Sequence, residues 1–407
     1  VKISRDRRHS PKGRAGLMRE WLRQLSEQGF DPLAEEVALQ SGGLRFKQIV
    51  DKFRNTVARA RGEYDFSHEV MEAMEGCLAC KACTSQCPIK VDVPTFRARF
   101  MQLYHSRYLR GPKDYFVGTV ESYAPLLANA TDKSTGMVDV PLLSVPTLAE
   151  ELRDHRARYF DLPGLEAMSP EQRHKVVLIV QDPFTSYYDA PVVRDLVKLA
   201  SKLGYQPYLL PFKPNGKPQH VKGFLRAFAR TAASSAQFLN KVAALGIPMV
   251  GVDPSLVLCY RDEYVKALGP ARGDFQVLLP QEWLLSLPAE ALPLREEAAA
   301  DPWYLFAHCT EKTAKPTTHG DWSTLFGRFG ARLQPVSVGC CGMAGTYGHD
   351  AKQVENSKGI YGLSWAEPLE RLPKARCLAT GYSCRSQVKR MEGEKLKHPL
   401  QALLELL

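Results

Sequence analysis

No stretch of the sequence approaches the run of about 18 apolar residues that a membrane-spanning helix requires. The basic N-terminus is not followed by the apolar core of a signal peptide. We therefore expect a cytoplasmic protein with no transmembrane segment. The chain begins at Val1 rather than at a methionine, so a processed product or a fragment is expected.

Patterns of nucleic-acid readers are also missing, although the formal net charge is +10. No zinc finger, RNA-recognition motif or helix-turn-helix pattern is present, and no stacking aromatics alternate with the basic residues. Much of the charge lies in Arg5, Arg7, Arg8, Lys12, Arg14, Arg19 and Arg23. We expect a solvated or partner-facing basic arm and no nucleic-acid partner, while attraction of an anionic substrate or an acidic redox partner stays open.

The sequence lacks a nucleophile paired with a base and a nucleotide-binding glycine motif, so no catalytic residue is assigned. Its 407 residues are enough for two or three domains, and 44% hydrophobic with 24% charged residues is ordinary for a globular protein. The ten cysteines are grouped in motifs. In a chain of this length, that grouping favours metal ligation in a reducing compartment over a disulfide scaffold.

The most informative motif is a run of four cysteines, Cys77, Cys80, Cys83 and Cys87, followed by Pro88. Its spacing, C-x2-C-x2-C-x3-C-P, is typical of [4Fe–4S] ligation in bacterial-type ferredoxins. Two residues between cysteines let a tight loop bring three thiolates to one cluster. The fourth cysteine points away and in two-cluster proteins ligates the other cluster. A structural zinc site is the alternative.

Residues 1–165 are predicted to be helical, with a long connection of little regular structure over about 112–170. Ser10 and Pro11 provide a helix cap and start before an apolar stripe formed by Leu17, Trp21, Leu22 and Leu25. Asp31 and Pro32 open a further helix, and residues 46–60 repeat apolar positions on one helical face. This pattern predicts a helical ferredoxin-like domain.

From about residue 174 the pattern changes to alternating strands and helices. Strands are expected at 175–180, 207–210, 247–252, 303–307, 333–338 and 377–380, with helices at 191–203 and 221–245. This order is typical of an α/β fold with mostly parallel sheets. Gly204 and Gly216 align with Gly330 and Gly342, each pair 12 positions apart, which indicates an internal duplication.

The second copy carries Cys309, Cys340, Cys341 and Cys384 where the first has Pro183, Pro214, Asn215 and Leu256. Because these cysteines follow the ends of three parallel strands, their thiols are predicted to meet in one crevice. Residues 343–348 are expected to open a helix whose N–H groups stabilise thiolates. Cys259 and Cys377 are interpreted as core residues in strands. His308 is held in reserve as a ligand, and His319 and His349 receive no role.

Cys309, Cys340-Cys341-Gly342 and Gly381-Tyr382-Ser383-Cys384 together resemble the cysteine-rich CCG domain. That domain occurs in heterodisulfide reductase, in the iron–sulfur subunits of glycolate oxidase and in anaerobic glycerol-3-phosphate dehydrogenase. The family pattern ends in C-x2-C, but Gly381 stands where the first cysteine of that pair would be. Four cysteines instead of five imply a single [4Fe–4S] cluster, a zinc ion or an empty site rather than a non-cubane double cluster.

The N-terminal stretch SRDRRHSPKGRAGLMREWLRQL resembles the segment between the two ferredoxin runs of those proteins, which implies another cysteine run upstream. The phrases QDPFTSYYDAPVV, LPFKPNGKPQHVKG, VDPSLVLCYRDEY and SVGCCGMAGTYGH resemble the C-terminal half of the large bacterial FAD-linked oxidases similar to D-2-hydroxyglutarate dehydrogenase. The resemblance implies an upstream FAD domain that oxidises a D-2-hydroxy acid. This chain would pass electrons to a quinone or an electron-transfer protein.

The expected fold is α + α/β, with a helical ferredoxin-like domain and connector at 1–165. A degenerate CCG-like α/β subdomain without cysteine ligands follows at 166–300, and a CCG-type cysteine-rich α/β subdomain at 301–407. The expected metal ligands are Cys77, Cys80, Cys83, Cys87, Cys309, Cys340, Cys341 and Cys384. A peripheral position at the inner membrane and a homo-oligomer stay open. Two alternatives remain: a separate electron-transfer subunit of a glycolate, lactate or glycerol-3-phosphate dehydrogenase complex, and a zinc-stabilised interaction module.

Overall fold

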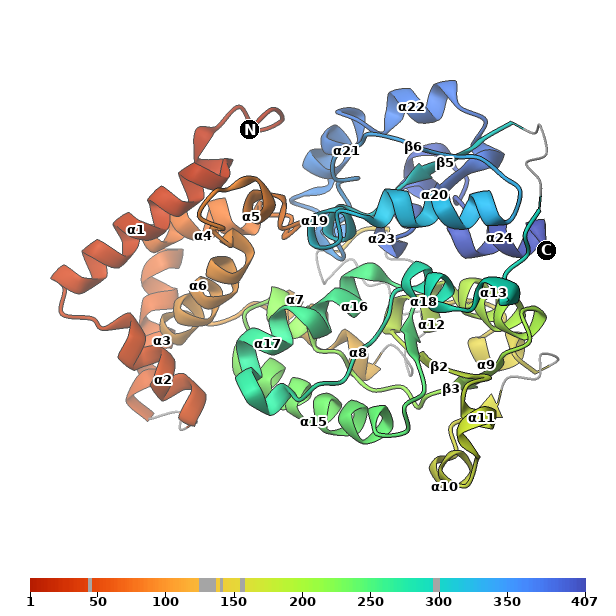
Figure 1. The fold of residues 1–407 in the computed structure, drawn as a ribbon. Coiled ribbons are helices and arrows are strands. Elements are labelled where there is room, and N and C mark those ends of the chain that lie inside the picture. The colour runs from red at the N-terminus through yellow and green to blue at the C-terminus, as the bar shows by residue number, and fades with distance from the viewer. Residues whose placement is uncertain (43–45, 124–136, 140–141, 154–157, 296–300) are drawn as a thin grey trace.

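The computed structural model describes residues 1–42, 46–123, 137–139, 142–153, 158–295 and 301–407. Its N-terminal part is helical and lies beside two stacked α/β units (Figure 1). The helical part consists of α1 (Pro11–Glu27), α2 (Pro32–Ser41), α3 (Phe46–Ala60), α4 (Ser67–Glu75), α5 (Ala82–Gln86) and α6 (Val93–Arg107). The helix starts at Pro11 and Pro32 that the sequence predicts are confirmed.

The helical part has a small aromatic core of its own. Ser10 caps α1 by accepting a hydrogen bond from the Gly13 N–H at 2.9 Å, as predicted. Trp21 on α1 is buried and meets the ring of Phe100 on α6 edge-to-face at 4.8 Å. The expectation of a solvated or partner-facing basic arm is wrong at Arg14, which is buried within the helical part and donates to the Ala73 carbonyl of α4 at 2.7 Å.

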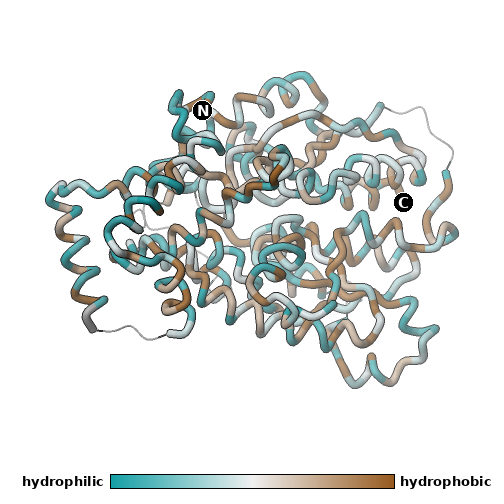
Figure 2. The backbone as a smooth tube through the Cα atoms, turned by 60° about the vertical axis from the view of Figure 1, so that its left-hand side comes forward, coloured by the Kyte–Doolittle hydropathy of each residue, from teal (hydrophilic) through white to brown (hydrophobic). Residues whose placement is uncertain are grey.

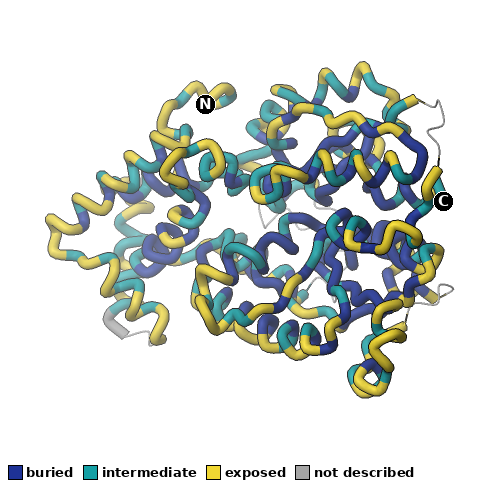
Figure 3. Tube along the Cα trace, in the orientation of Figure 1, coloured by how far each residue is buried: buried dark blue, intermediate teal, exposed yellow. Residues whose placement is uncertain are grey.

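The apolar face of α3 is not part of this core. The helix has the predicted bounds, but Ile49 is 48% exposed, Val50 50% and Phe53 63%. Figure 3 shows this peripheral part of the molecule as mainly exposed and intermediate in burial. The periodic pattern therefore predicted the helix correctly, while its apolar stripe is open on this surface.

The connection after α6 contains more regular structure than predicted. Its described residues form α7 (Pro112–Gly118), α8 (Val120–Tyr123), α9 (Leu148–Glu151), β1 (Arg158–Tyr159), α10 (Leu162–Glu166) and α11 (Pro170–Arg173). Strand β1 pairs in parallel with β3 (Gln206–Leu209), so the connection adds an edge strand to the first sheet. The rest of the predicted connection, at 124–136, 140–141 and 154–157, lies outside the described residues.

The first α/β unit is built on a parallel sheet in the order β1-β3-β2-β4. Besides β1 and β3, it contains β2 (Val176–Val180), α12 (Pro183–Tyr188), α13 (Ala190–Lys202), α14 (Lys217–Val221), α15 (Leu225–Ala243), β4 (Met249–Gly251), α16 (Pro254–Arg261), α17 (Glu263–Leu268) and α18 (Pro280–Ser286). The apolar run of β2 is buried between helices, as its unbroken β-branched sequence predicts.

The second α/β unit repeats this arrangement with the parallel order β6-β5-β7. It contains β5 (Trp303–Phe306), α19 (Cys309–Ala314), α20 (Thr318–Arg328), β6 (Leu333–Pro335), α21 (Val354–Gly362), α22 (Ala366–Arg371), β7 (Cys377–Ala379), α23 (Tyr382–Glu392) and α24 (Pro399–Leu406). In the two units β2 and β5 are the corresponding central strands, and β4 and β7 each form an isolated parallel bridge, Val250 to Leu278 and Leu378 to Lys397. This correspondence is what an internal duplication predicts.

The two units are held together by reciprocal helix packing. Helix α24 of the second unit packs on α13 of the first, and α18 of the first packs on α20 of the second. One hydrophobic cluster runs through both contacts, with Leu196, Trp283, Trp322 and Leu403 fully buried in it. This packing of helices brings the carboxyl ends of the strands of both units toward one shared crevice.

Hydrophobic residues are distributed in short segments along the chain. Figure 2 shows hydrophilic and hydrophobic residues alternating along the helices. Among the residues described, no helix has the length and apolarity needed to cross a membrane.

Candidate metal centre

The cysteine run of the helical part forms an open loop around α5. Ala79 and Lys81 adopt left-handed backbone conformations (φ 51° and 58°), which lets the chain turn sharply between cysteines. A cavity of about 850 Å³ is lined by Cys77, Cys80 and Cys83. The structure thus brings three of the four predicted ligands to one cavity.

Cys87 has a different environment. Backbone N–H groups of Val91, Ile89 and Lys90 surround its sulfur and lower the pKa of the thiol. It does not line the cavity shared by the other three cysteines. Cys87 is thus separate from the cavity that the other three cysteines of the motif line.

The loop is fixed to the first α/β unit by a buried charge network. The Lys81 ammonium lies 2.7 Å from the carboxylate of Glu263, which also pairs with Lys217 at 2.5 Å, and Lys81 pairs with Asp262 as well. Glu263 is 2% exposed, and although burial alone would raise its pKa, the two lysines hold the pKa well below its usual value. No sequence motif singles out Lys81, because its partners lie more than 180 residues away.

The four cysteines of the second unit converge as predicted. Cys309 begins α19 after β5, Cys340 and Cys341 follow β6, and Cys384 lies in the first turn of α23 after β7. Their thiols lie next to one another in the order Cys309, Cys340, Cys341, Cys384, and each affects the pKa of the next. The neighbouring Cys340 thiol, together with burial, raises the pKa of Cys309 well above its usual value. Metal binding at these cysteines would release the protons of their thiols.

Close backbone packing positions Cys340 and Cys341. Gly342 has φ +92°, and a Cβ there would lie 2.3 Å from the Ser357 carbonyl oxygen, so only glycine fits this turn. Its N–H donates to the Cys340 sulfur at 3.4 Å. The prediction that residues 343–348 open a helix is wrong: Ala344 and Gly345 have positive φ, and only a short 3₁₀ turn follows at Tyr347–His349.

The two units differ at the helix starts that face the crevice. In the first unit, Asp182 caps α12 and Asp253 caps α16 by accepting N–H hydrogen bonds from the first turn of each helix. His308 and Gly381 occupy the corresponding positions before α19 and α23; the His308 side chain does not cap its helix, and Gly381 has no side chain to do so. At the start of α23, the Tyr382 N–H instead donates to the carboxylate of Asp253 of the first unit at 2.9 Å.

The other cysteines and histidines lie apart from this group. Cys259 and Cys377 are fully buried core residues, although Cys259 lies on α16 and not in a strand as predicted. His349 is buried and bonded to Arg390 and the Val138 carbonyl. Within the described ranges, no three His, Cys, Asp or Glu side chains are arranged around a common point suited to a metal ion. The four thiols are the donor type that a thiophilic metal or cluster takes, although their side chains are not arranged around such a point in this structure.

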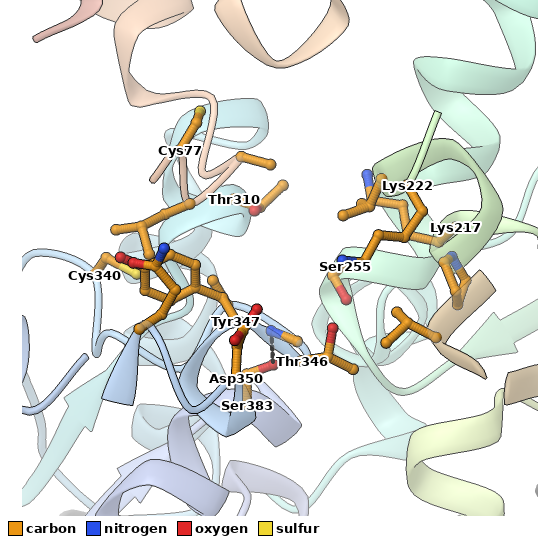
Figure 4. Close-up of a pocket in the computed structure, with 18 of the residues that line it drawn as sticks. Cys77, Lys217, Lys222, Ser255, Thr310, Cys340, Thr346, Tyr347, Asp350 and Ser383 are labelled. Carbon is orange, nitrogen blue, oxygen red and sulfur yellow. Dashed lines mark hydrogen bonds between the residues drawn. The ribbon is translucent and has the colours of Figure 1, made fainter. Parts of the chain in front are cut away.

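A cavity of about 130 Å³ lies where all three parts of the chain meet. In Figure 4, Cys77 comes from the helical part, Lys217, Lys222 and Ser255 from the first unit, and Cys340 from the second. Arg97 lines the same cavity, and its buried guanidinium donates to the carbonyls of Met74 and Val221 at 2.8 and 2.6 Å. Neither Arg97 nor the lysines carried a signal in the sequence that marked them as part of a site.

Fold and site together define a class: a helical segment with a ferredoxin-type cysteine run, followed by a duplicated parallel α/β unit of which one copy gathers four thiols. Over its whole length, the chain is 59% identical to D-2-hydroxyglutarate dehydrogenase of Pantoea ananatis and 58% identical to that of Escherichia coli K12. It spans 41% of the length of either relative. The predicted resemblance to enzymes of this kind is confirmed.

A more distant relative has nearly the same extent as the chain. One subunit of the anaerobic glycerol-3-phosphate dehydrogenase of Escherichia coli K12 is 22% identical, over 82% of this chain and 99% of that subunit. No family model and no solved structure matches the chain.

Proposed function

We propose that the chain is the iron–sulfur electron-transfer portion of an FAD-dependent D-2-hydroxy-acid dehydrogenase, with D-2-hydroxyglutarate as the favoured substrate and 2-oxoglutarate as its product. The observation that carries the proposal is the proximity of the two cysteine groups. Helix α5 packs against α19, and the Cys80 thiol interacts electrostatically with Cys309 and Cys340. Two redox centres held this close suit stepwise electron transfer.

In this proposal, Cys77, Cys80 and Cys83 hold three corners of a [4Fe–4S] cluster, which supplies one-electron chemistry when bound. Its fourth ligand comes from a second cysteine run elsewhere in the polypeptide, and Cys87 ligates the cluster of that run. Cys309, Cys340, Cys341 and Cys384 hold a second [4Fe–4S] cluster, with zinc as the alternative occupant. The chain itself contributes ligation, burial and charge, and no catalytic residue.

The proposed division is a ferredoxin-like domain at 1–165, a degenerate CCG-like subdomain at 166–300 and a CCG-type subdomain at 301–407. The proposed partners are an FAD-binding domain and an electron acceptor, either a quinone or an electron-transfer protein. The longer relatives, named as dehydrogenases, support the flavin domain. The proposed location is the cytoplasm, with a peripheral position at the inner membrane as the alternative.

The test is anaerobic purification followed by iron, sulfide and zinc analysis and by EPR spectroscopy of the dithionite-reduced protein. We expect iron and sulfide with a cluster signal. Cys83→Ser should lower the iron content and abolish electron flow to an external acceptor, while flavin reduction by substrate in the longer polypeptide continues. Cys377→Ala, a core cysteine in the same chain, is the matched control and should keep its iron. Zinc without a cluster signal, or unchanged turnover in Cys83→Ser, would overturn the proposal.

One alternative is supported by a separate observation. The similarity to the glycerol-3-phosphate dehydrogenase subunit extends over almost all of that subunit. A stand-alone electron-transfer subunit is therefore the second candidate. The polypeptide encoded by the complete gene distinguishes the two, because only the first requires flavin sites on the same chain.

A further inference from the structure

A groove of about 750 Å³ lies between the helical part and the first α/β unit. Helices α2 and α6 form one side of it, and α14, α15 and α17 form the other (Figure 1). It shares no described lining residue with the two cavities at the cysteines. Apolar side chains, among them Leu225 and Ala229, line it together with four exposed basic residues, Arg99, Arg226, Arg230 and Lys266. An apolar lining beside exposed polar side chains is the arrangement of a surface that docks another protein.

The acidic side chains in the lining of the groove are already paired with basic ones. Glu36 on α2 accepts a hydrogen bond from the Arg99 guanidinium of α6 at 2.8 Å. Glu263 on α17 pairs with both Lys81 and Lys217. Neither carboxylate therefore cancels the charge of a further cation in the groove.

Two arginines of the groove keep an unpaired charge. Arg226 and Arg230 lie about one turn apart on α15, and both are exposed. Neither guanidinium has an ion pair or a hydrogen bond with any residue that the structure describes. The Arg226 guanidinium lies over the backbone of Gly42 at the end of α2, so it reaches across the groove. The groove thus presents two positive charges that no described carboxylate neutralises, and it is complementary to an acidic surface.

The groove lies next to the cysteine loop. Glu263 lines the groove, and its carboxylate is 2.7 Å from the ammonium of Lys81, the residue that follows Cys80. The first turn of α6 separates the two hollows, because Pro94 lines the cavity of the cysteine loop and Thr95 lines the groove. A protein bound in the groove would therefore be a neighbour of the first cluster of the proposed function.

We propose that this groove docks an electron-transfer protein with an acidic surface, which accepts electrons from the cluster at Cys77, Cys80 and Cys83. The inference rests on the proposed function, and of its two acceptors it selects the protein over the quinone. In each transfer the cluster loses one electron and the oxidised carrier gains it, while no bond forms or breaks. Arg226 and Arg230 attract the acidic surface and speed the encounter, and salt weakens this attraction.

The test uses the whole chain with its metal and two probe proteins, the acidic blue-copper protein plastocyanin and the basic cytochrome c. The oxidised chain should bind plastocyanin more tightly than cytochrome c, and the reduced chain should reduce it faster. Raising the ionic strength from about 0.01 M to about 0.3 M should weaken the binding and slow the reduction of plastocyanin. Arg226→Glu/Arg230→Glu should reduce both the affinity and the rate by about tenfold or more at low ionic strength.

Because the whole chain carries a formal net charge of +10, a control with the same change of charge is needed. Lys202→Glu/Lys241→Glu reverses two exposed charges in the last turns of α13 and α15, about three turns beyond Arg230 in the case of Lys241. This variant should keep the affinity for plastocyanin within about twofold of the wild type. Equal losses in the two double variants would show attraction by the net charge alone and would overturn the role of the groove.

Two further measurements keep the inference falsifiable. If the glutamate variant does not fold, Arg226→Gln/Arg230→Gln takes its place and should show a smaller loss of the same kind. Equal iron content in wild type and variants shows that the substitutions act on docking and not on the cluster. A cluster-bearing chain that binds plastocyanin no better than cytochrome c would overturn the groove alone. A chain without any cluster would overturn the proposed function and, with it, electron transfer at this groove.

Discussion

The carboxylate of Glu121 accepts a hydrogen bond from the backbone N–H of Gly216 at 2.7 Å, while its other oxygen accepts the N–H of Asn215 at 2.9 Å. Asn215 and Gly216 are the counterparts of Cys341 and Gly342 in the second unit. A buried carboxylate from α8 thus occupies, in the first unit, the turn that carries thiols in the second. This carboxylate comes from the connection that precedes the repeated strands and helices of the first unit.

Removing this carboxylate should destabilise the first unit. Glu121→Ala leaves two buried N–H groups without an acceptor, which costs about 1–3 kcal/mol for each. We expect faster amide hydrogen exchange in residues 213–221 and a lower midpoint of thermal unfolding. Exchange in the second unit, around Cys340, serves as the internal control. Unchanged protection of 213–221 would show that the carboxylate does not hold this turn.

Glu121 should also make stability depend on pH. Burial raises the pKa of Glu121 to about 7, against 4.5 in the unfolded chain, even though the two N–H groups lower it. The folded state therefore holds the proton more tightly. The contribution of Glu121 to stability is complete below about pH 4.5 and is lost as the pH rises through 7, a change on the order of 3 kcal/mol.

Denaturant unfolding of the wild type and Glu121→Gln at pH 5 to 8 tests this dependence. The difference in unfolding free energy between the two proteins should change over that range. Burial and the neighbouring Asp253 also raise the pKa of Asp182 to about 7, so part of the slope should persist in the variant. Parallel pH profiles for the two proteins would contradict the assignment to Glu121.

The contact between the cysteine loop and the first unit should depend on Glu263. Its carboxylate is shared by Lys81 and Lys217, so Glu263→Gln leaves two partly buried ammonium groups without their common partner. Breaking a buried pair in this way costs about 3–5 kcal/mol. We expect increased hydrogen exchange in residues 77–87. The pKa of Glu263 is lowered by the lysines, so its stabilisation is present above about pH 4.5 and is lost on acidification.

A surface carboxylate provides the matched control for Glu263. Glu367→Gln removes an exposed pair with Arg371 on α22, which is worth at most about 1 kcal/mol. Hydrogen exchange of the cysteine loop should be unchanged in that variant. Equal effects of the two substitutions on residues 77–87 would show that the buried network does not fix the loop.

The sequence predicted the arrangement of the cysteines better than that of the charges around them. The gathering of Cys309, Cys340, Cys341 and Cys384 follows from the rule that parallel strands end at one edge, and periodicity placed α3 correctly. The sequence did not predict the roles of Glu121, Lys81 and Arg97, because their partners are distant in the chain. Residues 343–348 do not form the predicted helix, because the tight turns at Gly342, Ala344 and Gly345 require positive φ.

Arg97 should tune the first cluster of the proposed function. Its guanidinium is buried, donates to the carbonyls of Met74 and Val221, and has no carboxylate at ion-pair distance among the residues described. Burial lowers the pKa of Arg97, and the nearby Cys77, which lines the same cavity, opposes this effect. Arg97→Gln removes a positive charge that stabilises the reduced cluster. We expect the midpoint potential to fall by tens of millivolts, on the order of what one partly screened charge contributes.

An EPR-monitored redox titration measures this shift. Arg99→Gln is the control, since Arg99 lies on the same helix but pairs with Glu36 at the surface, and its loss should leave the potential unchanged. A potential that is the same in Arg97→Gln and wild type would contradict the role of this charge, provided that both hold equal amounts of iron.

The last prediction concerns the joint between the two units. Arg385 on α23 is fully buried, and its guanidinium donates to one carboxylate oxygen of Asp189 at 2.8 and 3.0 Å and to the carbonyls of Ala379 and Thr380 at 2.9 Å. Arg385→Met removes the main counter-charge of Asp189 and leaves two carbonyls unpaired. We expect the free energy of unfolding, measured by chemical denaturation, to fall by about 3–5 kcal/mol.

In the same variant, the stability of the contact between the two units should depend less strongly on pH in the acidic range. Although burial alone would raise the pKa of Asp189, Arg385 and Lys395 hold it below its usual value, so the pair stabilises the fold above about pH 4 and the stabilisation is lost as the pH falls. Because the cysteines of the second unit and the lysines of the first meet across this joint, weakening it should also loosen the cavity between them. Arg371→Met on exposed α22 should leave stability within about 0.5 kcal/mol of the wild type. Equal unfolding midpoints for Arg385→Met and Arg371→Met would show that the buried pair does not hold the units together.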